Sequence, residues 1–470
     1  MTQCNKQHLL FQDLGNRKVV AGFDGGTISS DAGALLLREI DLAHGLLDSF
    51  SACFTDMRDE RYVEHSVRDL IAQRVFALCL GYEDLNDHDT LRTDPLLGTV
   101  CGKTDPAGEH RKYARDQGYA LAGKSTLNRL ELQPRHLLDT DRYKKIVANE
   151  RKINEFFVEV FLRSYESPPD ELILDLDATD DPLHGEQEGR FFHGYYDCYC
   201  YLPLYIFCGD HLLCAKLRPS NIDAAAGSVE EVSRIVEQIR HRWPEVTIHL
   251  RADSGFCREE LFGWCESHRV GYFIGMARNS RLVKRISRQR KQAQELYETT
   301  GRPARVFADF SYRTNNSWSR SRRIVAKAEH LEKGANPRFV VYHDPWNRHT
   351  GPSEIYENIY CARGEMENRI KEQQLYLFAD RTSAGIMRAN QLRLWFSSLA
   401  YVIMNELRNR ALKHTEFEHA TCETIRLKLL KIGALVRVSV RRVSISISSA
   451  YPYQHIFRAA HLSIRQALLC

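Results

Sequence analysis

The chain has 470 residues, 43% of them hydrophobic and 10% aromatic, and a formal net charge of +4, a composition typical of globular proteins with two or three domains. Its longest apolar window, residues 394–404, falls short of the roughly 18 residues of a membrane-spanning helix, and polar side chains interrupt the region where a secretion signal would lie. We therefore expect no membrane insertion and no export, but a cytoplasmic protein.

Residues 1–165 are predicted to be mostly helical. Apolar residues recur at helical spacing over 30–47 and 63–82, and a charged helix over 140–165 leads to a boundary at the two prolines of 166–171. We expect this region to form a separate N-terminal domain.

Residues 118–126, GYALAGKST, match the phosphate-binding pattern of Gly, four residues, Gly, Lys and Ser. Such a loop functions between a buried strand and a helix N-terminus, whose N–H groups hold the phosphate. The preceding stretch, 109–117, is charged or polar at nearly every position and cannot be a buried strand. We favour a helix capped by Ser125 or Thr126, with Lys124 exposed.

Residues 166–280 are predicted to alternate between strands and helices. Strands are expected at 171–179, 195–209, 211–220, 246–253 and 271–279, and helices at 229–239 and 258–269. The resulting order, β-β-β-α-β-α-β, describes a mixed α/β sheet that opens with antiparallel neighbours and is completed by crossovers.

Residues 281–350 are predicted to form a basic, β-rich insertion. Between Arg278 and Lys327 there are fourteen Lys or Arg residues against three Asp or Glu, a net charge of +11, so the rest of the chain sums to −7. Clusters of this kind gain affinity for polyanions by releasing counterions from phosphates. A solvated basic surface without a partner is the alternative.

Helical spacing resumes after the insertion and defines a region 351–412, which includes an apolar helix ending near Arg408. The tail, 413–470, is predicted to contain a helix and strands. Its apolar alternation changes phase at Arg441 and Arg442, which indicates a bulge or a tight turn between two strands.

Two aspartates share one face of the strand at 171–179. Alternation places Ile173, Asp175 and Asp177 on the same side. Carboxylates on a buried strand are costly unless a partner neutralises them, and the usual partner is a cation. Asp253 ends the strand at 246–253, where its side chain can leave the sheet edge.

A third acid lies on a predicted helix. Arg363, Glu367, Lys371 and Gln374 form one continuous polar stripe, with Tyr360 one turn earlier. A surface helix with ion pairs between successive turns would show the same pattern. The stripe therefore indicates a functional site only in combination with the aspartates on the strands.

These acids are hard oxygen ligands of the kind that Mg²⁺ prefers, and a pair of such ions can clamp both oxygens in phosphodiester displacement. With the strand order and the basic insertion, they describe an RNase H-like nuclease core. The chain resembles the DDE transposases of bacterial insertion sequences, in the branch with the signature Tyr-x2-Arg-x3-Glu-x6-Lys. Tyr360, Arg363 and Glu367 match that spacing, whereas Gln374 stands where the lysine is expected.

The resemblance extends over nearly the whole chain. Similar segments include FDGGTISSDAGALLLREID, STLNRLE, LDLDATDDPLHGEQEG, LRADSGF and RANQLRLWFSSLAY. It implies an RNase H-like mixed sheet that is interrupted by the β-rich insertion and preceded by the mostly helical domain, which would bind DNA ends or dimerise.

The resemblance also implies the roles of individual residues. Asp177, Asp253 and Glu367 would hold two Mg²⁺ ions, for which Mn²⁺ can substitute. Asp177 is preferred to Asp175 because the family pattern is Asp-x-Thr. Contacts with DNA would come from Tyr360, Arg363 and Lys371, and from Arg285, Arg288, Arg322 and Arg323 of the insertion.

The implied activity is hydrolysis of a phosphodiester at each end of an insertion sequence, followed by attack of the freed 3′-hydroxyl on target DNA. The implied partners are double-stranded DNA, at the terminal inverted repeats and the target, and a second copy of the chain in a homodimer. Two alternatives are a P-loop NTPase that uses residues 118–126 and a DNA-binding relative that has lost catalysis, to which Gln374 would point.

Overall fold

The computed structural model describes residues 8–134, 144–349 and 351–467, and the chain divides into two compact units. Unit 1 comprises Met1–Val147 and Leu399–Cys470, and unit 2 comprises Ala148–Ser398. Among the described residues, no helix combines the length and the apolar character needed to cross a lipid bilayer.

Unit 2 is built on a nine-stranded mixed sheet. Its strands follow the order β11-β10-β6-β12-β13-β17-β15-β14, and the short β16 pairs with β15. β6, β12 and β13 are parallel, and the other neighbours are antiparallel. The strands are β6 (Glu171–Ala178), β10 (Leu204–Cys208), β11 (His211–Lys216), β12 (Thr247–Ala252), β13 (Gly271–Met276), β14 (Ala304–Tyr312), β15 (Arg322–Leu331), β16 (Gly334–Ala335) and β17 (Arg338–His343).

The first part of this sheet confirms the predicted order and the RNase H-like fold. Along the chain it runs β6, β10, β11, α8 (Ser228–Arg242), β12, α9 (Glu259–Ser267) and β13. The predicted hairpin turns at Gly209, which has a φ of 59°. The strand expected at 195–209 is divided before Leu204, because Pro203 has no N–H to donate to a ladder.

Helices cover this sheet with apolar faces. Val232, Ile235, Val236 and Ile239 of α8 are buried at helical spacing in the main core. From its sequence, α7 (Glu150–Arg163) is predicted to belong with the N-terminal helices. Its buried face instead joins the core of β6, so α7 is part of unit 2. The predicted start of that helix, 140–143, lies outside the described residues.

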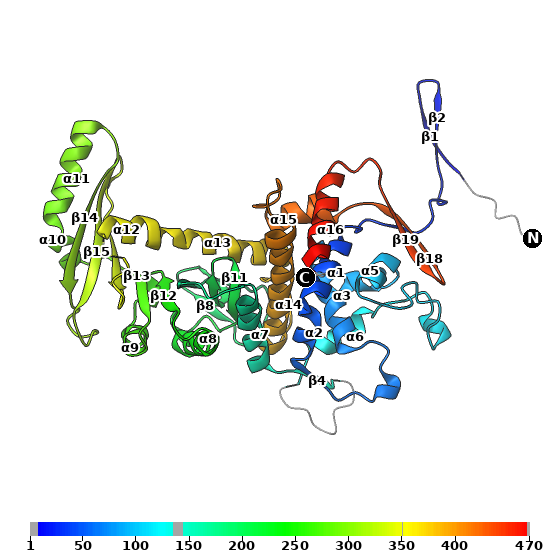
Figure 1. Cartoon of the computed structure of the whole chain (residues 1–470), viewed down its shortest axis with the longest axis horizontal. Coiled ribbons are helices and arrows are strands. Elements are labelled where there is room, and N and C mark those ends of the chain that lie inside the picture. Colours follow the sequence, from blue (N-terminus) through cyan, green and yellow to red (C-terminus); the bar gives the residue numbers. More distant parts are fainter. Residues whose placement is uncertain (1–7, 135–143, 350, 468–470) are drawn as a thin grey trace, which may run out of the picture. The chain divides into compact units, whose positions relative to one another are not determined.

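The insertion continues the sheet. It begins with α10 (Ser280–Arg285) and α11 (Ser287–Thr300), and its strands β14, β15 and β17 lie beyond β13 (Figure 1). β17 pairs with β13 from Tyr272 opposite His343 to Met276 opposite Phe339. The insertion is thus fixed to the core by a continuous hydrogen-bonded ladder.

The helical region after the insertion is interrupted. It contains α12 (Pro352–Glu354), a π-helical stretch Ile355–Tyr360, a 3₁₀ turn Cys361–Arg363, α13 (Gly364–Lys371) and a second π-helical stretch Glu372–Tyr376. The sequence indicated helix throughout to Arg408. In the structure, Phe378 adopts a left-handed conformation that ends the first helix, and α14 (Met387–Glu406) begins separately.

A small three-stranded sheet is inserted between β6 and β10. It has the order β7-β9-β8 and consists of β7 (Asp181–Pro182), β8 (Phe191–His193) and β9 (Cys198–Tyr201). It immediately follows the strand that carries Asp177.

Unit 1 is mostly helical, as its N-terminal sequence predicts. Its central helix, α3, buries every residue from Leu70 to Leu80 and begins with a capping box between Ser66 and Asp69. The helix expected at 30–47 is divided by Gly45, which has a φ of 60°. The helices are α1 (Ala34–His44), α2 (Leu46–Ser51), α3 (Val67–Leu80), α4 (His88–Leu91), α5 (Pro95–Val100), α6 (Lys124–Glu131), α15 (Cys422–Ile425) and α16 (Gln454–Ala467).

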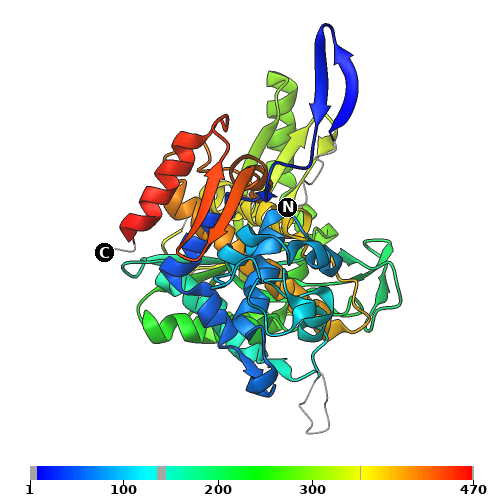
Figure 2. The same cartoon turned by 90° about the vertical axis from the view of Figure 1, so that its right-hand side faces the viewer.

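Short strands accompany these helices. β18 (Ala434–Ser439) and β19 (Arg442–Ile447) form a hairpin beside α16, and β18 also pairs with β3 (Ile28–Ser29) (Figure 2). The change of phase at Arg441 is therefore a tight turn, one of the two predicted possibilities. β4 (Phe54–Asp56) pairs with β5 (Ile146–Ala148), and β1 (Leu9–Leu14) pairs with β2 (Arg17–Ala21) in an exposed hairpin.

Candidate catalytic site

Asp177 and Asp253 lie at the same end of two neighbouring parallel strands. β6 and β12 pair from Glu171 opposite Thr247 to Leu176 opposite Ala252, so the two aspartates occupy the next position on each strand. Neighbouring strands are about 4.8 Å apart, which brings the two side chains together. Oδ1 of Asp177 accepts a hydrogen bond from its neighbour's N–H at 3.0 Å, and Oδ1 of Asp253 accepts one from the Gly255 N–H at 2.8 Å.

Asp175 shares the sheet face of Asp177 but has a different environment. It is 2% exposed, and both of its oxygens accept hydrogen bonds from Arg251, at 2.5 and 2.7 Å. Arg251 lies directly opposite on β12 and also donates to the Ile359 carbonyl at 2.5 Å. Because a fork-shaped guanidinium occupies both oxygens, Asp175 has a structural ion pair, and this favours Asp177 as the reactive acid.

Arg363 connects the third acid to the strands. Its Nη2 donates to Oε1 of Glu367, one turn later along the helix, at 2.9 Å. Its Nη1 lies 3.7 Å from Oδ2 of Asp177. One guanidinium thus lies between a carboxylate on β6 and another on α13.

Two of the acids, Asp253 and Glu367, act electrostatically on the third, Asp177. Burial raises the pKa of Asp177 to about 7, and the carboxylates of Asp253 and Glu367 contribute to the rise, whereas Arg363 opposes it. Like charges raise a carboxyl pKa in this way only at short range. Asp253 and Glu367 therefore both lie close enough to Asp177 to act on its carboxylate.

The hydroxyl of Tyr360 lies close to the backbone next to Asp253, because Gly275 has no Cβ atom to occupy that space. A Cβ atom at Gly275 would overlap the Tyr360 hydroxyl oxygen and would lie 3.0 Å from the N–H of Ser254, the residue after Asp253. Burial raises the pKa of Tyr360, Arg363 opposes this and Asp253 adds to it. Tyr360 ends a π-helical stretch, a form of helix found often at functional sites.

The acids have the ligand chemistry of a Mg²⁺ site. Within the parts of the chain that the structure describes, no three His, Cys, Asp or Glu side chains are gathered closely enough to enclose a metal ion. The guanidinium of Arg363 supplies the positive charge between Asp177 and Glu367 instead. Carboxylate oxygens are nevertheless the donors that Mg²⁺ prefers, so the residues present fit this ion in type.

Lys371 and Gln374 lie further along the same helical segment. Lys371 is exposed one turn after Glu367. Gln374 donates from Nε2 to the Asp180 carbonyl at 3.0 Å. The glutamine that departs from the family signature thus fastens this segment to the loop after β6.

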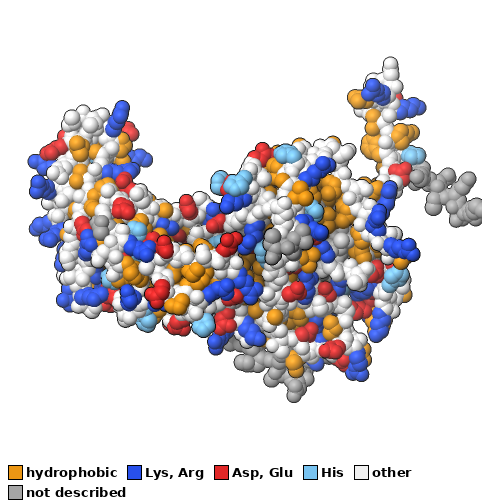
Figure 3. Space-filling view, viewed as in Figure 1, with side chains coloured by type: hydrophobic (Ala, Val, Ile, Leu, Met, Phe, Trp, Pro, Cys, Tyr) orange, Lys and Arg blue, Asp and Glu red, His pale blue; other side chains and the backbone are white. Residues whose placement is uncertain are grey.

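The basic residues of the insertion differ in exposure. Figure 3 shows Lys and Arg side chains gathered over α10 and α11, where Arg285 and Arg288 are exposed. The side chain of Arg322 is only 2% exposed and is bound by the carboxylates of Glu259 and Glu266, so the prediction that it contacts DNA is corrected: it is a core residue. Arg323 is half exposed and pairs with Asp309 and the Tyr342 hydroxyl.

The GYALAGKST stretch lacks the framework of a phosphate loop. No strand leads into it among residues 109–123, all of which are described. The helix α6 starts at Lys124 without a side-chain cap, so the expected cap at Ser125 or Thr126 is wrong. Lys124 Nζ lies 3.2 Å from a carboxylate oxygen of Asp89. The structure therefore gives the NTPase alternative no support.

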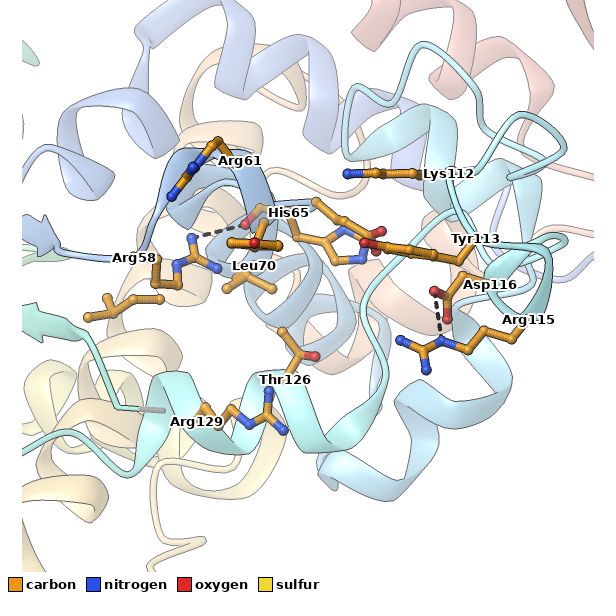
Figure 4. Close-up of a pocket in the computed structure, with 13 residues that line it drawn as sticks. Arg58, Arg61, His65, Leu70, Lys112, Tyr113, Arg115, Asp116, Thr126 and Arg129 are labelled. Carbon is orange, nitrogen blue, oxygen red and sulfur yellow. Dashed lines mark hydrogen bonds and ion pairs between the residues drawn. The ribbon is translucent and has the colours of Figure 1, made fainter. Parts of the chain in front are cut away.

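Unit 1 contains a pocket of about 430 Å³ that sequence analysis missed. Basic and aromatic side chains line it together, among them Arg58, Arg61, Lys112, Arg115, Arg129, Tyr62 and Tyr113 (Figure 4). Two carboxylates, Glu64 and Asp116, are also present. The signal in the sequence is the interleaving of arginine and tyrosine in RDERY, 58–62, and RKYAR, 111–115.

Comparison with known protein families gives a match over almost the whole chain. The family described as transposase DDE domain group 1 matches residues 11–468. No curated protein matches significantly.

Proposed function

This chain belongs to the DDE transposases, and on that basis we propose that it cuts DNA at the ends of an insertion sequence and joins the freed ends to target DNA. The observation that carries the proposal is the grouping of Asp177, Asp253 and Glu367 around Arg363. Three acids from two strands and a helix are of the type that holds the ions in phosphodiester displacement, and the release of Asp177 and Glu367 from Arg363 would free them to do so.

Asp177, Asp253 and Glu367 would hold two Mg²⁺ ions, with Mn²⁺ as a substitute. When bound, such ions stabilise the negative charge that develops on a phosphodiester during displacement. The raised pKa of Asp177 supports this assignment, because its causes, burial and neighbouring carboxylates, are those that a cation relieves.

Arg363 is proposed to exchange partners when DNA binds. Its planar fork suits two oxygens of a phosphate as well as those of a carboxylate. Turning to the DNA backbone would release Asp177 and Glu367, its partners in the structure. Tyr360 would contact the backbone beside it, and the exposed Lys371 would supply the charge that the signature lysine provides in relatives.

We propose two successive reactions at the acids. Water first attacks the phosphodiester at the element end and leaves a 3′-hydroxyl. That hydroxyl then attacks a target phosphodiester, so that one bond forms as another breaks and no covalent protein–DNA intermediate is needed.

DNA would be bound by both units. In unit 2 the proposed contacts are the exposed Arg285 and Arg288, with Arg323 at the edge, and Arg322 is no longer among them. In unit 1 the pocket of Figure 4 is a candidate for recognising the element ends. Two ends must be joined in one event, so we propose a homodimer acting on DNA in the cytoplasm.

The test uses a supercoiled plasmid that carries this reading frame with its natural flanking DNA. The wild-type chain should cut it at the element ends when Mg²⁺ is present. Asp177→Asn, Asp253→Asn and Glu367→Gln should each lower the cutting rate by at least about 100-fold, with little change in DNA affinity. Glu365→Gln, an exposed acid on the same helix, is the matched control and should cut normally.

Two results would refute the proposal. Normal cutting by any of the three acid variants would show that the reaction does not depend on this site. Binding of the plasmid by the wild-type chain without cutting, even in Mn²⁺, would favour the non-catalytic relative.

A further inference from the structure

The hairpin of β8 and β9 exposes large aromatic side chains. Phe192 is 54% exposed, Tyr199 46% and Tyr195 85%. Exposed aromatic residues grouped on one small element indicate a surface that binds a ligand or another macromolecule. None of them has a part in the cutting reaction described above.

Phe192, Tyr199 and Arg190 are in mutual contact through the Tyr199 ring. Phe192 lies directly opposite Tyr199 in the β8–β9 ladder, with ring centroids 5.6 Å apart. The guanidinium carbon of Arg190 lies 4.8 Å from the centroid of the Tyr199 ring. We call Arg190, Phe192, Tyr195 and Tyr199 the aromatic surface.

Hydrogen bonds from neighbouring segments fix the backbone of the hairpin that carries the aromatic surface. The Ser220 hydroxyl donates to the Phe191 carbonyl at 2.9 Å, and the Tyr201 hydroxyl donates to the Glu188 carbonyl at 2.6 Å. β9 also pairs with β7 at Asp181. A rigid support lowers the entropic cost of binding to exposed side chains.

Tyr196 joins this hairpin to the acids. Its hydroxyl donates to the carbonyl of Ala178, the residue after Asp177, at 3.3 Å. Its ring lies 5.0 Å from that of Tyr195, at 87°. Asp177 and Asp253 both act electrostatically on Tyr196. Through Tyr196, the Tyr195 part of the aromatic surface is therefore connected to the residue after Asp177.

We propose that the aromatic surface stacks unpaired bases of the DNA strand that is cut at the neighbouring acids. Aromatic rings combined with an arginine form the usual platform for unpaired nucleotides, because every base has a π face. A paired duplex offers its bases only at their edges, so the platform suits nucleotides that have left the helix. This inference rests on the proposed function for the position of the cut strand.

The test measures binding and does not require cutting. The full chain is titrated against a fluorescein-labelled oligothymidylate and against a duplex of the same length. Phe192→Ala/Tyr199→Ala should weaken oligothymidylate binding by about tenfold and leave duplex binding nearly unchanged. Phe192→Leu/Tyr199→Leu keeps apolar side chains without π faces and should lose as much affinity.

Two further variants complete the design. Phe192→Tyr/Tyr199→Phe keeps both rings and should bind the oligothymidylate like the wild type. Leu462→Ala on α16, which removes an equally exposed apolar side chain from unit 1, should also bind normally. Unchanged binding by the alanine pair, or full recovery with the leucine pair, would overturn the inference. A changed oligomeric state with unchanged oligothymidylate binding would overturn it too and would indicate a protein partner.

Failure here is distinguishable from failure of the proposed function. If the plasmid is cut and the alanine pair binds the oligothymidylate normally, only the stacking inference fails. If the plasmid is not cut but the alanine pair loses oligothymidylate affinity, the transposition chemistry fails and the aromatic surface remains a nucleotide-binding site.

Discussion

A single residue, Arg363, offsets the negative charge of two carboxylates in the candidate site. It contacts Glu367 at 2.9 Å and Asp177 at 3.7 Å, at the position where the carboxylates would otherwise face one another. A second polar cluster lies at the opposite end of the same strands. There the Glu171 carboxylate lies 2.9 Å from the His249 ring and 3.0 Å from that of His349.

Glu171 leads to a prediction on stability. The close contact with the buried ring of His249, together with the hydrogen bond to His349, lowers the pKa of Glu171 from 4.5 to about 2. A depressed carboxyl pKa stabilises the folded state above the unfolded value and loses its effect as pH falls toward the folded value. Glu171→Gln should therefore lower the free energy of unfolding by about 1 to 3 kcal/mol at pH 6, and the deficit should shrink between pH 4.5 and 2.

Urea unfolding of the wild type and the variant across this pH range measures the difference. Glu365→Gln, whose carboxylate is exposed, serves as the control and should show no such convergence. A deficit that stays constant down to pH 2 would show that Glu171 acts through packing and not through its charge.

At the scale of elements, β13 and the π-helical stretch meet at Gly275. A side chain at this position would overlap the Tyr360 hydroxyl and press on the backbone beside Asp253. Gly275→Ala should cost about 1 to 3 kcal/mol of stability by overpacking and should reduce DNA cutting. Removing the hydroxyl with Tyr360→Phe should recover part of the lost stability in the double variant.

The measurement is a double-mutant cycle on the thermal midpoint of unfolding. Gly263→Ala is the matched control, because a Cβ there meets nothing within 4 Å, and it should not destabilise α9. Strictly additive effects of Gly275→Ala and Tyr360→Phe would contradict the contact between the two elements.

Much of the element order could be predicted from the sequence, because strands and helices leave local periodic patterns. Alternation placed Asp175 and Asp177 on one face of β6, but only the pairing of β6 with β12 shows Arg251 opposite Asp175. The extension of the sheet beyond β13 depends on pairs from Met276 with Phe339 to Tyr272 with His343, which are far apart in the chain, and no local pattern records that pairing.

The same limit applies to individual side chains. Arg322 has the sequence character of a surface residue, and its burial follows from Glu259 and Glu266 on another element. The pocket of unit 1 brings residues 58–65 and 112–116 together with side chains of α3, α6 and β5, and the sequence does not record that these segments meet. The break at Phe378 depends on a backbone conformation that is rare for a residue with a side chain.

At the scale of the whole molecule, the family match from residue 11 to residue 468 covers both units. The acids belong to unit 2, and each of the two units carries basic side chains that are suited to phosphates. Such a distribution is expected of an enzyme that must hold DNA over a long stretch and cut it at one point.

We propose that Asp177, Asp253 and Glu367 share divalent cations. With hydrogen peroxide and ascorbate added, Fe²⁺ bound in place of Mg²⁺ reduces the peroxide to hydroxide and a hydroxyl radical, which cleaves the polypeptide close to the ion, and ascorbate returns the Fe³⁺ to Fe²⁺. In the full chain, we expect cleavage close to all three residues. Excess Mg²⁺ should suppress this cleavage, and Asp177→Asn should abolish it at all three positions. Cleavage close to only one of the three, or cleavage that persists in Asp177→Asn, would contradict the proposal.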